Sequence, residues 1–492
     1  MITTGPSSSC KFGSGQHLQS VHFLGICGKA MGGIAVALAR EGWLVSGSDE
    51  KCYSPMLEYL RDGGINIRTP YAAANVPDGV GLVVVGKRVA SGNPELAHVL
   101  AKGIPHYSFP QFLHRHFLCR SRNAVVAGGV GKTTTTSMLA WILEHAGLKP
   151  DYLIGGQAAN FSSSARFAGS GHAVLEGDEY ASCFDDPRPK FLHYRPEVGI
   201  ITNIVEDHPD IYGSFEDLCG VFARFIESLP AHGSLITAAR DDAAVRLTRQ
   251  AGRKLITTGF EADATAGITN PRFDTTTSSF ELLGTEFILP LCGRMNVMNA
   301  AMAVLAAKEF GVEPGQAAEA IRVFAGVHNR QEEMEFADTT LVCDKASHPR
   351  SLAELSRALR QRFPGRRLVS IIQPRATGGK DWVYQRDLPD ALNGFDSVIM
   401  TSAYEHNPQQ PQRWADDPFC LNLLAAALEE KSTAVTVSRT TAEIDDILAA
   451  GIHAGDVVLL TILEQSHALR DRVVTTLGSR SNPLDRAGSA VC

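Results

Sequence analysis

The sequence predicts an α/β protein of three domains, and three observations support this. Short runs of β-branched residues alternate with segments of helical periodicity along most of the 492 residues, a pattern typical of βαβ units and parallel sheets. Polar breaks near Arg120–Asn123 and Val327–Met334 divide the chain into pieces of about 120, 210 and 160 residues, each the size of one domain. A glycine-rich turn follows the first strand of each of the first two pieces.

The first domain is expected to span residues 21–122, the second 123–333 and the third 334–478. The ends, 1–20 and 479–492, are rich in Ser, Gly and other polar residues and are expected to be disordered. The expected strands are, in chain order, Val21–Leu24, Trp43–Ser46, Leu82–Val85, Ala124–Ala127, Ala173–Leu175, Gly199–Thr202, Thr340–Asp344, Leu368–Ile372, Asp396–Met400 and Asp456–Thr461.

Composition excludes several classes of protein. Lys and Arg number 46 and Asp and Glu 53, a formal charge of −7, which argues against a nucleic-acid-binding protein. No apolar run reaches the roughly 18–20 residues that cross a bilayer, and residues 1–9 do not resemble a secretory signal. The ten cysteines lack metal-ligand spacing and are expected to be reduced thiols of a cytoplasmic protein, monomeric or homodimeric.

A phosphate-binding loop is predicted between Ala124–Val126 and the helix expected from Thr134. Its sequence is Gly128-Gly129-Val130-Gly131-Lys132-Thr133, one glycine short of the usual eight-residue pattern. Backbone N–H groups of such a loop cradle phosphates, the lysine reaches the β- and γ-phosphates, and the hydroxyl ligates Mg²⁺. The alternative is a tight turn with no ligand, which the strand–loop–helix context disfavours.

Acidic residues follow two neighbouring strands of the second domain. In parallel sheets such strand ends meet at one edge, where a bound nucleotide would also lie. Carboxylates there favour Mg²⁺, although each cluster alone would also suit a solvated loop. The polar residues at the two strand ends are Glu176, Asp178 and Glu179, then Asn203, Glu206, Asp207 and His208.

The first domain shows a second glycine-rich turn. Gly25-Ile26-Cys27-Gly28 follows Val21–Leu24, and Asp49 follows the next strand, which is the arrangement of a Rossmann-like nucleotide-binding domain. The glycine spacing is not the strict dinucleotide pattern, and a dehydrogenase is the rival interpretation. A phosphate loop in the next domain has no role in hydride transfer, so it argues against that rival.

Taken together, these motifs resemble the Mur ligase family, most closely its muropeptide-recycling members. The resemblance implies a Rossmann-like N-terminal domain, a central P-loop ATPase domain and a C-terminal Rossmann-like domain. It also implies ATP-dependent amide-bond formation through an acyl phosphate, from a UDP-sugar carboxylate and an amine. The matching phrases are Gly25-Ile26-Cys27-Gly28, Ala30-Met31-Gly32, Ser48-Asp49, Tyr53-x-Pro55-Met56, Gly92-Asn93-Pro94-Glu95, Thr133–Leu148, Ile154-Gly155-Gly156, Asn160-Phe161 and His193-Tyr194-Arg195-Pro196.

The resemblance also implies roles for individual residues. ATP would be held by Gly128, Gly129, Gly131, Lys132, Thr133, Thr134, Asn296, Asn299, Arg330 and Asp344, and Mg²⁺ by Thr133, Glu176 and His208. The catalytic set would be Lys132, Glu176, His208, Asp344, Lys345 and His348. The UDP-sugar would contact Gly25, Cys27, Gly28, Lys29, Met31, Gly32, Ser48 and Asp49.

Several motif positions depart from the family pattern, and they favour a ligase repurposed for another carboxylate or amine, for example in specialised metabolism. The ordinary peptidoglycan-recycling ligase and a non-catalytic nucleotide-binding paralogue are the alternatives. Glu464 is expected to repel an anionic peptide. The departures are Lys29 for Thr, Gly129-Val130 for Thr-His, Val205 for Glu, Met295 for His, Asn329 for Arg, Cys343-Asp344-Lys345-Ala346-Ser347-His348-Pro349 for an Asp-Asp-aromatic-Ala-His-His-Pro motif, and Ile462–Ser466 for a glycine-rich loop.

Overall fold

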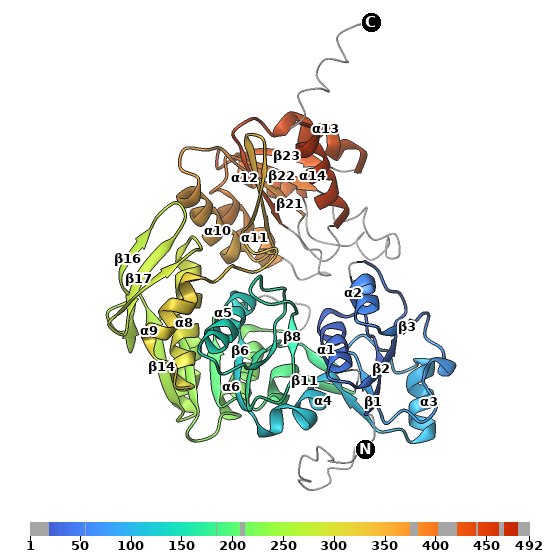
Figure 1. Cartoon of the computed structure of the whole chain (residues 1–492). Helices are drawn as coiled ribbons and strands as arrows, with labels where there is room; N and C mark the ends of the chain where they lie inside the picture. Colours follow the sequence, from blue (N-terminus) through green and yellow to red (C-terminus); the bar gives the residue numbers. More distant parts are fainter. Residues whose placement is uncertain are drawn as a thin grey trace, which may run out of the picture.

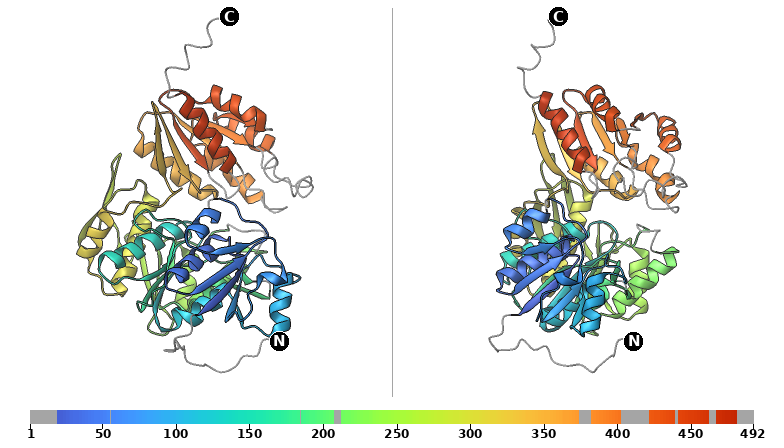
Figure 2. Two further views of the ribbon diagram at one scale, coloured as in Figure 1. Left: turned by 45° about the vertical axis from the view of Figure 1, so that its right-hand side comes forward. Right: turned by 90° about the vertical axis from the view of Figure 1, so that its right-hand side faces the viewer.

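The computed structural model shows three α/β domains, each built around a mainly parallel sheet (Figure 1). The structure describes residues 19–54, 56–183, 185–206, 212–373, 382–401, 421–438, 441–461 and 467–480. The first two domains lie side by side, and the third lies across them at the top of the view in Figure 1 and in both views of Figure 2. This confirms the predicted three-domain α/β architecture.

The first domain has a five-stranded parallel sheet in the order β3-β2-β1-β4-β5. The strand order reverses between β1 and β4. In sheets of this kind the ligand crevice lies beyond the carboxyl ends of the two strands at the reversal. The elements are β1 (Ser20–Leu24), α1 (Lys29–Arg40), β2 (Leu44–Ser48), α2 (Met56–Asp62), β3 (Asn66–Arg68), β4 (Leu82–Val85), α3 (Pro94–Lys102), β5 (His106–Ser108) and α4 (Phe109–His116).

The second domain has an eight-stranded sheet in the order β15-β14-β13-β12-β6-β9-β7-β8, parallel except between β7 and β8. The phosphate loop joins its central strand β6 to α5, which packs against α8 and α9. The elements are β6 (Arg122–Ala127), α5 (Lys132–His145), β7 (Asp151–Leu153), β8 (Ala165–Arg166), β9 (His172–Glu176), β12 (Val198–Ile201), α6 (Phe215–Glu227), β13 (Ser234–Ala238), α7 (Asp242–Gln250), β14 (Lys254–Gly259), β15 (Ala266–Gly267), α8 (Arg294–Glu309) and α9 (Pro314–Arg322).

Two small antiparallel sheets belong to the second domain, and the sequence patterns did not predict them. A hairpin pairs β10 (Ala181–Cys183) with β11 (Asp186–Pro189), and a three-stranded sheet joins β16 (Thr269–Phe273), β17 (Ser278–Leu282) and β18 (Thr285–Leu289). The alternation Ser278–Leu282, with every second residue buried, has the period of a half-buried strand and is the signal that could have revealed the larger sheet.

The third domain has a six-stranded sheet in the order β19-β20-β24-β21-β22-β23, parallel except between β19 and β20. Two separate apolar clusters cover its two faces. The elements are β19 (Glu332–Phe336), β20 (Thr339–Asp344), α10 (Pro349–Arg362), β21 (Leu368–Ile372), α11 (Trp382–Leu392), β22 (Ser397–Thr401), α12 (Leu421–Glu429), β23 (Ala434–Ser438), α13 (Thr441–Gly451), β24 (Val457–Thr461) and α14 (His467–Arg480).

One hydrophobic core is continuous across the first two domains. It joins Phe112 and Phe117 of the first domain to Phe167 of the second, whose ring centroid lies 5.0 Å from that of Phe117. Helix α1 also packs against β8. The first and second glycine-rich turns are therefore held on a shared, packed support.

The expected strands all form, within one or two residues of the expected ends. β1 starts at Ser20 and α14 continues to Arg480, so each domain end extends slightly into a segment that we expected to be disordered. α14 does so because Leu469, Val473 and Leu477 are buried against the sheet. Residues 1–18 and 481–492 lie outside the described part of the chain.

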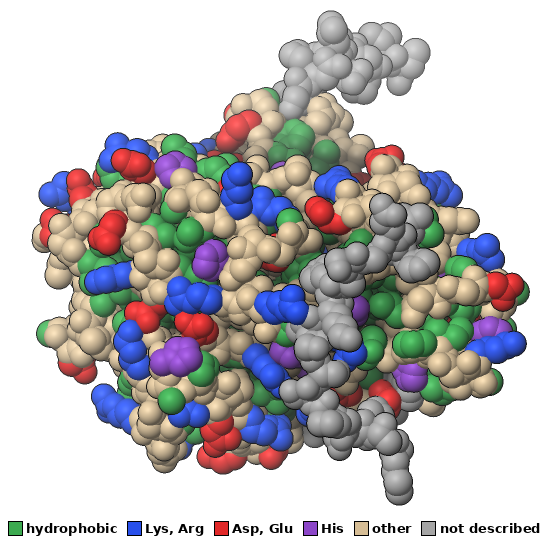
Figure 3. Space-filling view, turned by 60° about the horizontal axis from the view of Figure 1, so that its bottom comes forward, with side chains coloured by type: hydrophobic (Ala, Val, Ile, Leu, Met, Phe, Trp, Pro, Cys, Tyr) green, Lys and Arg blue, Asp and Glu red, His purple; other side chains and the backbone are tan. Residues whose placement is uncertain are grey.

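The surface agrees with the modest net charge. Figure 3 shows one face on which Lys and Arg side chains are interspersed with Asp and Glu, so neither sign forms a stripe there. Within the described residues, no helix is long and apolar enough to cross a bilayer.

Candidate active site

The phosphate loop lies between β6 and the first turn of α5. Gly131 has φ +94°, a conformation that favours glycine, and it directs the chain into the helix. Asn203, just beyond β12, fixes the loop from the side: its Oδ1 accepts from Val130 N at 3.0 Å and its Nδ2 donates to Val130 O at 2.8 Å. The amide of Gly129 donates to the Asn203 carbonyl at 3.1 Å. The sequence placed Asn203 among the polar residues at this strand end but assigned it no role, and the structure shows that it holds the loop.

Lys132 is folded back over the loop. Its Nζ donates to the carbonyl of Gly128, lies 3.3 Å from the carbonyl of Gly129, and pairs with Glu179 at 3.2 Å. The side chains of Lys132 and Glu179 are only 12% and 4% exposed, so water screens this pair weakly. The lysine is thus held in the loop by groups with which a phosphate would compete.

Thr133 and Glu176 form the predicted metal pair. Thr133 Oγ1 donates to Glu176 Oε1 at 2.9 Å, and Gly155 N donates to Glu176 Oε2 at 2.6 Å. Burial raises the pKa of Glu176, the Asp178 charge raises it further, and Lys132 opposes both effects. A hydroxyl and a carboxylate suit Mg²⁺, which keeps several waters and takes phosphate oxygens as further ligands.

His208, the third predicted metal ligand, lies outside the described residues, as does Asp207. Within the described part of the chain no cluster of three or more His, Cys, Asp or Glu side chains forms a metal site by itself. The Thr133–Glu176 pair therefore fits a metal whose other ligands come from a nucleotide and from solvent.

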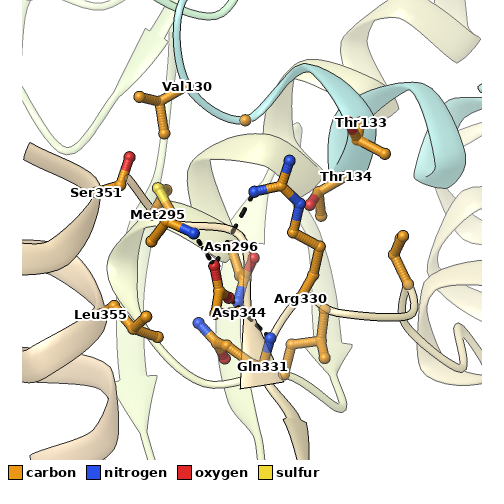
Figure 4. A pocket seen from close by; sticks show the side chains of 14 residues that line it. Val130, Thr133, Thr134, Met295, Asn296, Arg330, Gln331, Asp344, Ser351 and Leu355 are labelled. Carbon is orange, nitrogen blue, oxygen red and sulfur yellow. Dashed lines mark hydrogen bonds and ion pairs between the residues drawn. The ribbon is translucent and has the colours of Figure 1, made fainter. Parts of the chain in front are cut away.

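A pocket with about 530 Å³ of empty space opens beside the loop, between the second and third domains (Figure 4). It is lined by Val130, Gly131, Thr133, Thr134, Leu291, Met295, Asn296, Val327, Arg330, Gln331, Asp344, Ala346, Ser351 and Leu355.

The predicted asparagines lie at the start of α8. Asn296 Nδ2 donates to the Cys292 carbonyl at 2.8 Å, while Asn299 is buried against Gly131. Asn299 Nδ2 is a buried donor with no hydrogen-bond partner among the described residues. A buried donor of this kind is unusual in a native protein, and it suits an acceptor atom of a ligand bound at the loop.

Asp344, at the end of β20, brings the third domain to this pocket. Its carboxylate accepts from Gln331 N at 2.8 Å and Ala346 N at 2.7 Å, and lies 4.0 Å from the guanidinium of Arg330. Burial raises the pKa of Asp344, and the Arg330 charge opposes that effect. In Figure 4 a dashed line joins the guanidinium of Arg330 to the carboxylate of Asp344.

Lys345 and His348 follow Asp344 but are not among the residues that line this pocket. The Lys345 backbone donates to Asn329 O at 3.1 Å, and His348 caps α10 by accepting from Arg350 N at 3.1 Å. The structure therefore gives His348 a local role that the sequence did not predict.

The glycine-rich turn of the first domain is braced by Asp49. Asp49 Oδ2 accepts from Cys27 N at 2.9 Å, and Gly25 N donates to Ser48 O at 2.8 Å. Gly28 and Lys29 are exposed at the start of α1. Burial raises the pKa of Asp49, with backbone hydrogen bonds such as that from Cys27 opposing.

Three of the predicted substrate contacts, Ser48, Met31 and Gly32, are buried in the first domain. Ser48 is fully buried, and its hydroxyl donates to the Glu95 carboxylate, which also accepts from Asn75 Nδ2 at 2.7 Å and Ala72 N at 3.0 Å. Met31 is packed in the core, and Gly32 lies close to the Met56 side chain and to the Ile26 carbonyl, which would be 3.2 Å from a Cβ at this position. These residues pack in the interior of the first domain and support the glycine-rich turn.

The prediction that all the cysteines are reduced thiols was wrong: Cys119 is disulfide-bonded, and so are the two cysteines described next. Cys27, in the glycine-rich turn, and Cys52, beyond β2, form a disulfide with a Cα–Cα distance of 5.7 Å. Pairing of β1 with β2 brings their carboxyl ends together, which places the two thiols within bonding distance. Cys183, Cys219, Cys292 and Cys343 are free and buried, as expected.

Comparison with known proteins identifies the family. The model of the Mur ligase middle domain matches residues 126–307, and the model described as "Mur ligase family, catalytic domain" matches residues 20–118. A UDP-N-acetylmuramate–L-alanyl-γ-D-glutamyl-meso-2,6-diaminoheptandioate ligase from Haemophilus influenzae is 35% identical over 395 residues, 78% of this chain and 85% of the relative. The chain belongs to the Mur ligase family.

Two further matches extend the same relationship to this Mur ligase. The Escherichia coli protein of the same name is 34% identical over 419 residues, covering 81% of this chain and 90% of the relative. The crystal structure of a murein peptide ligase from Psychrobacter arcticus is 27% identical, covers 93% of this chain and 98% of its own, and superposes with a TM-score of 0.69.

These findings confirm the predicted family, fold and reaction class: the protein is an ATP-dependent ligase that forms carbon–nitrogen bonds. The narrower prediction of a repurposed substrate gains no support from them, because both curated relatives are named for the same UDP-N-acetylmuramate–peptide ligation.

Proposed function

We propose that this Mur ligase joins the carboxylate of UDP-N-acetylmuramate to the amino group of L-alanyl-γ-D-glutamyl-meso-diaminopimelate, as in peptidoglycan recycling. The observation that carries the proposal is the pocket between the second and third domains, where the phosphate loop faces the Arg330–Asp344 pair. The names of the relatives at 34–35% identity support the choice of substrates. ATP and UDP-sugars are cytoplasmic metabolites, so we assign the reaction to the cytoplasm.

In the proposed reaction the substrate carboxylate attacks the γ-phosphorus of ATP, and ADP leaves. The amine then attacks the acyl phosphate carbon, loses a proton, and displaces phosphate. Both partners of the first step are anionic, so positive charge at the site must reduce their repulsion. We assign this task to Lys132, which exchanges the loop carbonyls and Glu179 for phosphate oxygens.

Thr133 and Glu176 are the proposed protein ligands of Mg²⁺, with His208 completing the set. When bound, the ion would neutralise phosphate charge. Asn296, Asn299 and Arg330 are the proposed contacts to the nucleotide, and Asp344 orients Arg330 from the third domain. Asp344 is thus the proposed contact between the third domain and the ATP pocket.

The crevice beyond β1 and β4 is the proposed UDP-sugar site. Gly28 and Lys29 lie at its mouth, at the N-terminus of α1, where a diphosphate is stabilised by the helix dipole and by the lysine charge. The brace from Asp49 and the disulfide between Cys27 and Cys52 hold this turn in one conformation. A turn that is already ordered loses less conformational entropy when its ligand binds.

A second candidate is the same chemistry with a smaller or less anionic amine. It rests on Ile462–Ser466, which replaces the family's glycine-rich loop and includes Glu464. This segment lies outside the described residues. A buried substrate carboxylate facing Glu464 would cost several kcal/mol of binding free energy. The sequence therefore favours this second candidate, whereas the names of the relatives at 34–35% identity favour the tripeptide.

The deciding experiment measures ADP release and amide formation from ATP and UDP-N-acetylmuramate, with the tripeptide compared against free amino acids and amines. Efficient turnover with the tripeptide supports the proposed function. Turnover with another amine alone supports the second candidate. ATP binding with no turnover for any amine would refute both and leave a nucleotide-binding paralogue.

A further inference from the structure

The motif Gly92-Asn93-Pro94-Glu95 begins helix α3 and buries its glutamate in the first domain. Asn93 caps the helix, because its side chain accepts from Glu95 N at 2.9 Å. Glu95 itself is fully buried. Its carboxylate accepts from the Ser48 hydroxyl and lies 3.3 Å from Nε2 of His22. The glutamate is thereby joined to β1, which carries His22, and to the end of β2, which carries Ser48.

The same carboxylate holds the loop that follows β3. Ala72 N donates to Glu95 Oε1 at 3.0 Å, and Asn75 Nδ2 donates to the same oxygen at 2.7 Å. A buried carboxylate needs such partners, and removing them is costly. The loop of residues 69–76 is therefore fixed near the carboxyl ends of β1 and β2, and Tyr71 lies within it.

Tyr71 reaches the glycine-rich turn. Its hydroxyl lies 3.7 Å from the position of an ideal Cβ on Gly25, and it donates to Asp49 Oδ1 at 3.5 Å. The other oxygen of Asp49 accepts from Cys27 N of the turn at 2.9 Å. Burial raises the pKa of Tyr71, and the charge of Asp49 raises it further. A half-buried, protonated hydroxyl and a carboxylate therefore lie together beside the turn.

The two sides of the crevice differ in what they face. On the β4 side, the Nζ of Lys87 lies 4.1 Å from the ring centroid of Tyr180 in the second domain. The residue before that tyrosine, Glu179, pairs with Lys132 of the phosphate loop at 3.2 Å. A ligand whose phosphates lie at the turn and whose carboxylate reacts at the ATP site must therefore direct its sugar toward β4. Its nucleoside then lies on the other side, toward β2 and β3, where Tyr71 is.

We propose that the Tyr71 hydroxyl binds a ribose hydroxyl of the uridine nucleotide and forms, with Asp49, the recognition site for the ribose. The inference rests on the proposed function, because it requires a UDP-sugar whose phosphates lie at the glycine-rich turn. A tyrosine hydroxyl both donates and accepts, so Tyr71 keeps its proton directed at Asp49 and accepts from the ribose. The carboxylate accepts from the neighbouring ribose hydroxyl, as the acidic residue at this strand end does in Rossmann-like domains.

The test measures the affinity of the whole protein for UDP, 2′-deoxy-UDP and 3′-deoxy-UDP by calorimetric titration. The variant is Tyr71→Phe, and the matched control is Tyr107→Phe on β5, at the opposite edge of the sheet from β3. We expect Y71F to weaken UDP about fivefold, as for the loss of one neutral hydrogen bond. For the deoxy nucleotide that lacks the hydroxyl bound by Tyr71, Y71F and wild type should agree within about twofold, because the partner is already missing.

The other deoxy nucleotide should lose affinity in Y71F as UDP does, and Y107F should bind all three nucleotides as the wild type does. ATP affinity of Y71F, a reporter of an intact second domain, should stay at the wild-type value. Equal losses for all three nucleotides, or an unchanged affinity for UDP, would overturn the role of Tyr71 and leave the proposed function standing. A wild-type protein that binds ATP but neither UDP nor UDP-N-acetylmuramate would refute the proposed function itself.

Discussion

Replacement of Gly129 by Ala tests whether the phosphate loop and the segment after β12 are packed as one unit. The backbone of Gly129 lies outside the left-handed region, so a methyl group brings no strain of that kind. An ideal Cβ there would lie 2.4 Å from Cγ2 of Val205 and 3.1 Å from Oδ1 of Asn203. The first distance is too short, so Val205 must move. Asn203 carries the hydrogen bonds that hold Val130, so the loop must move with it.

Overpacking of this kind costs about 1–3 kcal/mol. Val205→Ala alone removes two methyl groups from a half-buried side chain and should cost about 1 kcal/mol. The double variant combines Gly129→Ala with Val205→Ala and has no clash. Its loss in free energy of unfolding should therefore be about 1–2 kcal/mol smaller than the sum of the losses in the two single variants. ATP affinity should fall about tenfold in G129A, the equivalent of about 1.4 kcal/mol, and recover in the double variant.

Urea unfolding measures the stability, and calorimetric titration the ATP affinity, of the wild type, the two single variants and the double variant. The control is Gly220→Ala, which lies within α6 and has no atom within 4 Å of the new Cβ. It should gain about 0.5–1 kcal/mol of stability and bind ATP as wild type does. Additive losses in the double variant would refute the coupling between loop and segment, and with it the packing described above.

Three further outcomes are expected. Lys132→Ala should abolish ATP binding by calorimetry or weaken it more than a hundredfold, because the loop loses its only lysine; unchanged affinity would contradict the P-loop assignment. His116 packs against Phe112, and burial, helped by Arg115, lowers its pKa to about 4. The pKa of a histidine in the unfolded chain is about 6.5, so the free energy of unfolding should fall as the pH drops from about 6.5 toward 4. The fall should be smaller in His116→Phe. An equal pH dependence of urea unfolding in the two proteins would contradict this. Reduction should weaken UDP-sugar binding by the wild type and leave Cys52→Ser unaffected in a titration with each UDP-sugar, since only the wild type has the Cys27–Cys52 disulfide beside the glycine-rich turn.

The phosphate loop and the strands around it were predictable because their signals are local. A buried β-branched run, a glycine turn and Lys132-Thr133 lie within about a dozen consecutive residues, and the chemistry of phosphate binding needs them in that order. Parallel pairing then placed Glu176 at the same sheet edge as the loop. Its hydrogen bond to Thr133 follows from that register.

The contacts that the sequence did not reveal have a different origin. Ser48 follows a strand in the same way as Asp49, but its side chain turns inward to Glu95, which is 47 residues away in the chain. The disulfide depends on the pairing of β1 with β2, and cysteine spacing alone does not reveal it. Asn203 has no motif, because its function is to satisfy the backbone of Val130. Each of these features is set by tertiary contacts between segments that are distant in sequence.

The contact between Gly129 and Val205 links two of the departures from the family pattern. The resemblance described above implies Thr and Glu at these two positions, and here both polar side chains are absent from one contact. The Cβ of a threonine at position 129 would also lie 2.4 Å from Cγ2 of Val205. The departures at positions 129 and 205 therefore depend on each other, and we treat them as a single change. Thr133 and Glu176 still form their hydrogen bond, and Lys132 still lies in the loop. Decay of an unused site would change positions independently of their contacts. A paired change that preserves the loop, together with an intact Lys132, Thr133 and Glu176, argues that this Mur ligase still binds and uses ATP.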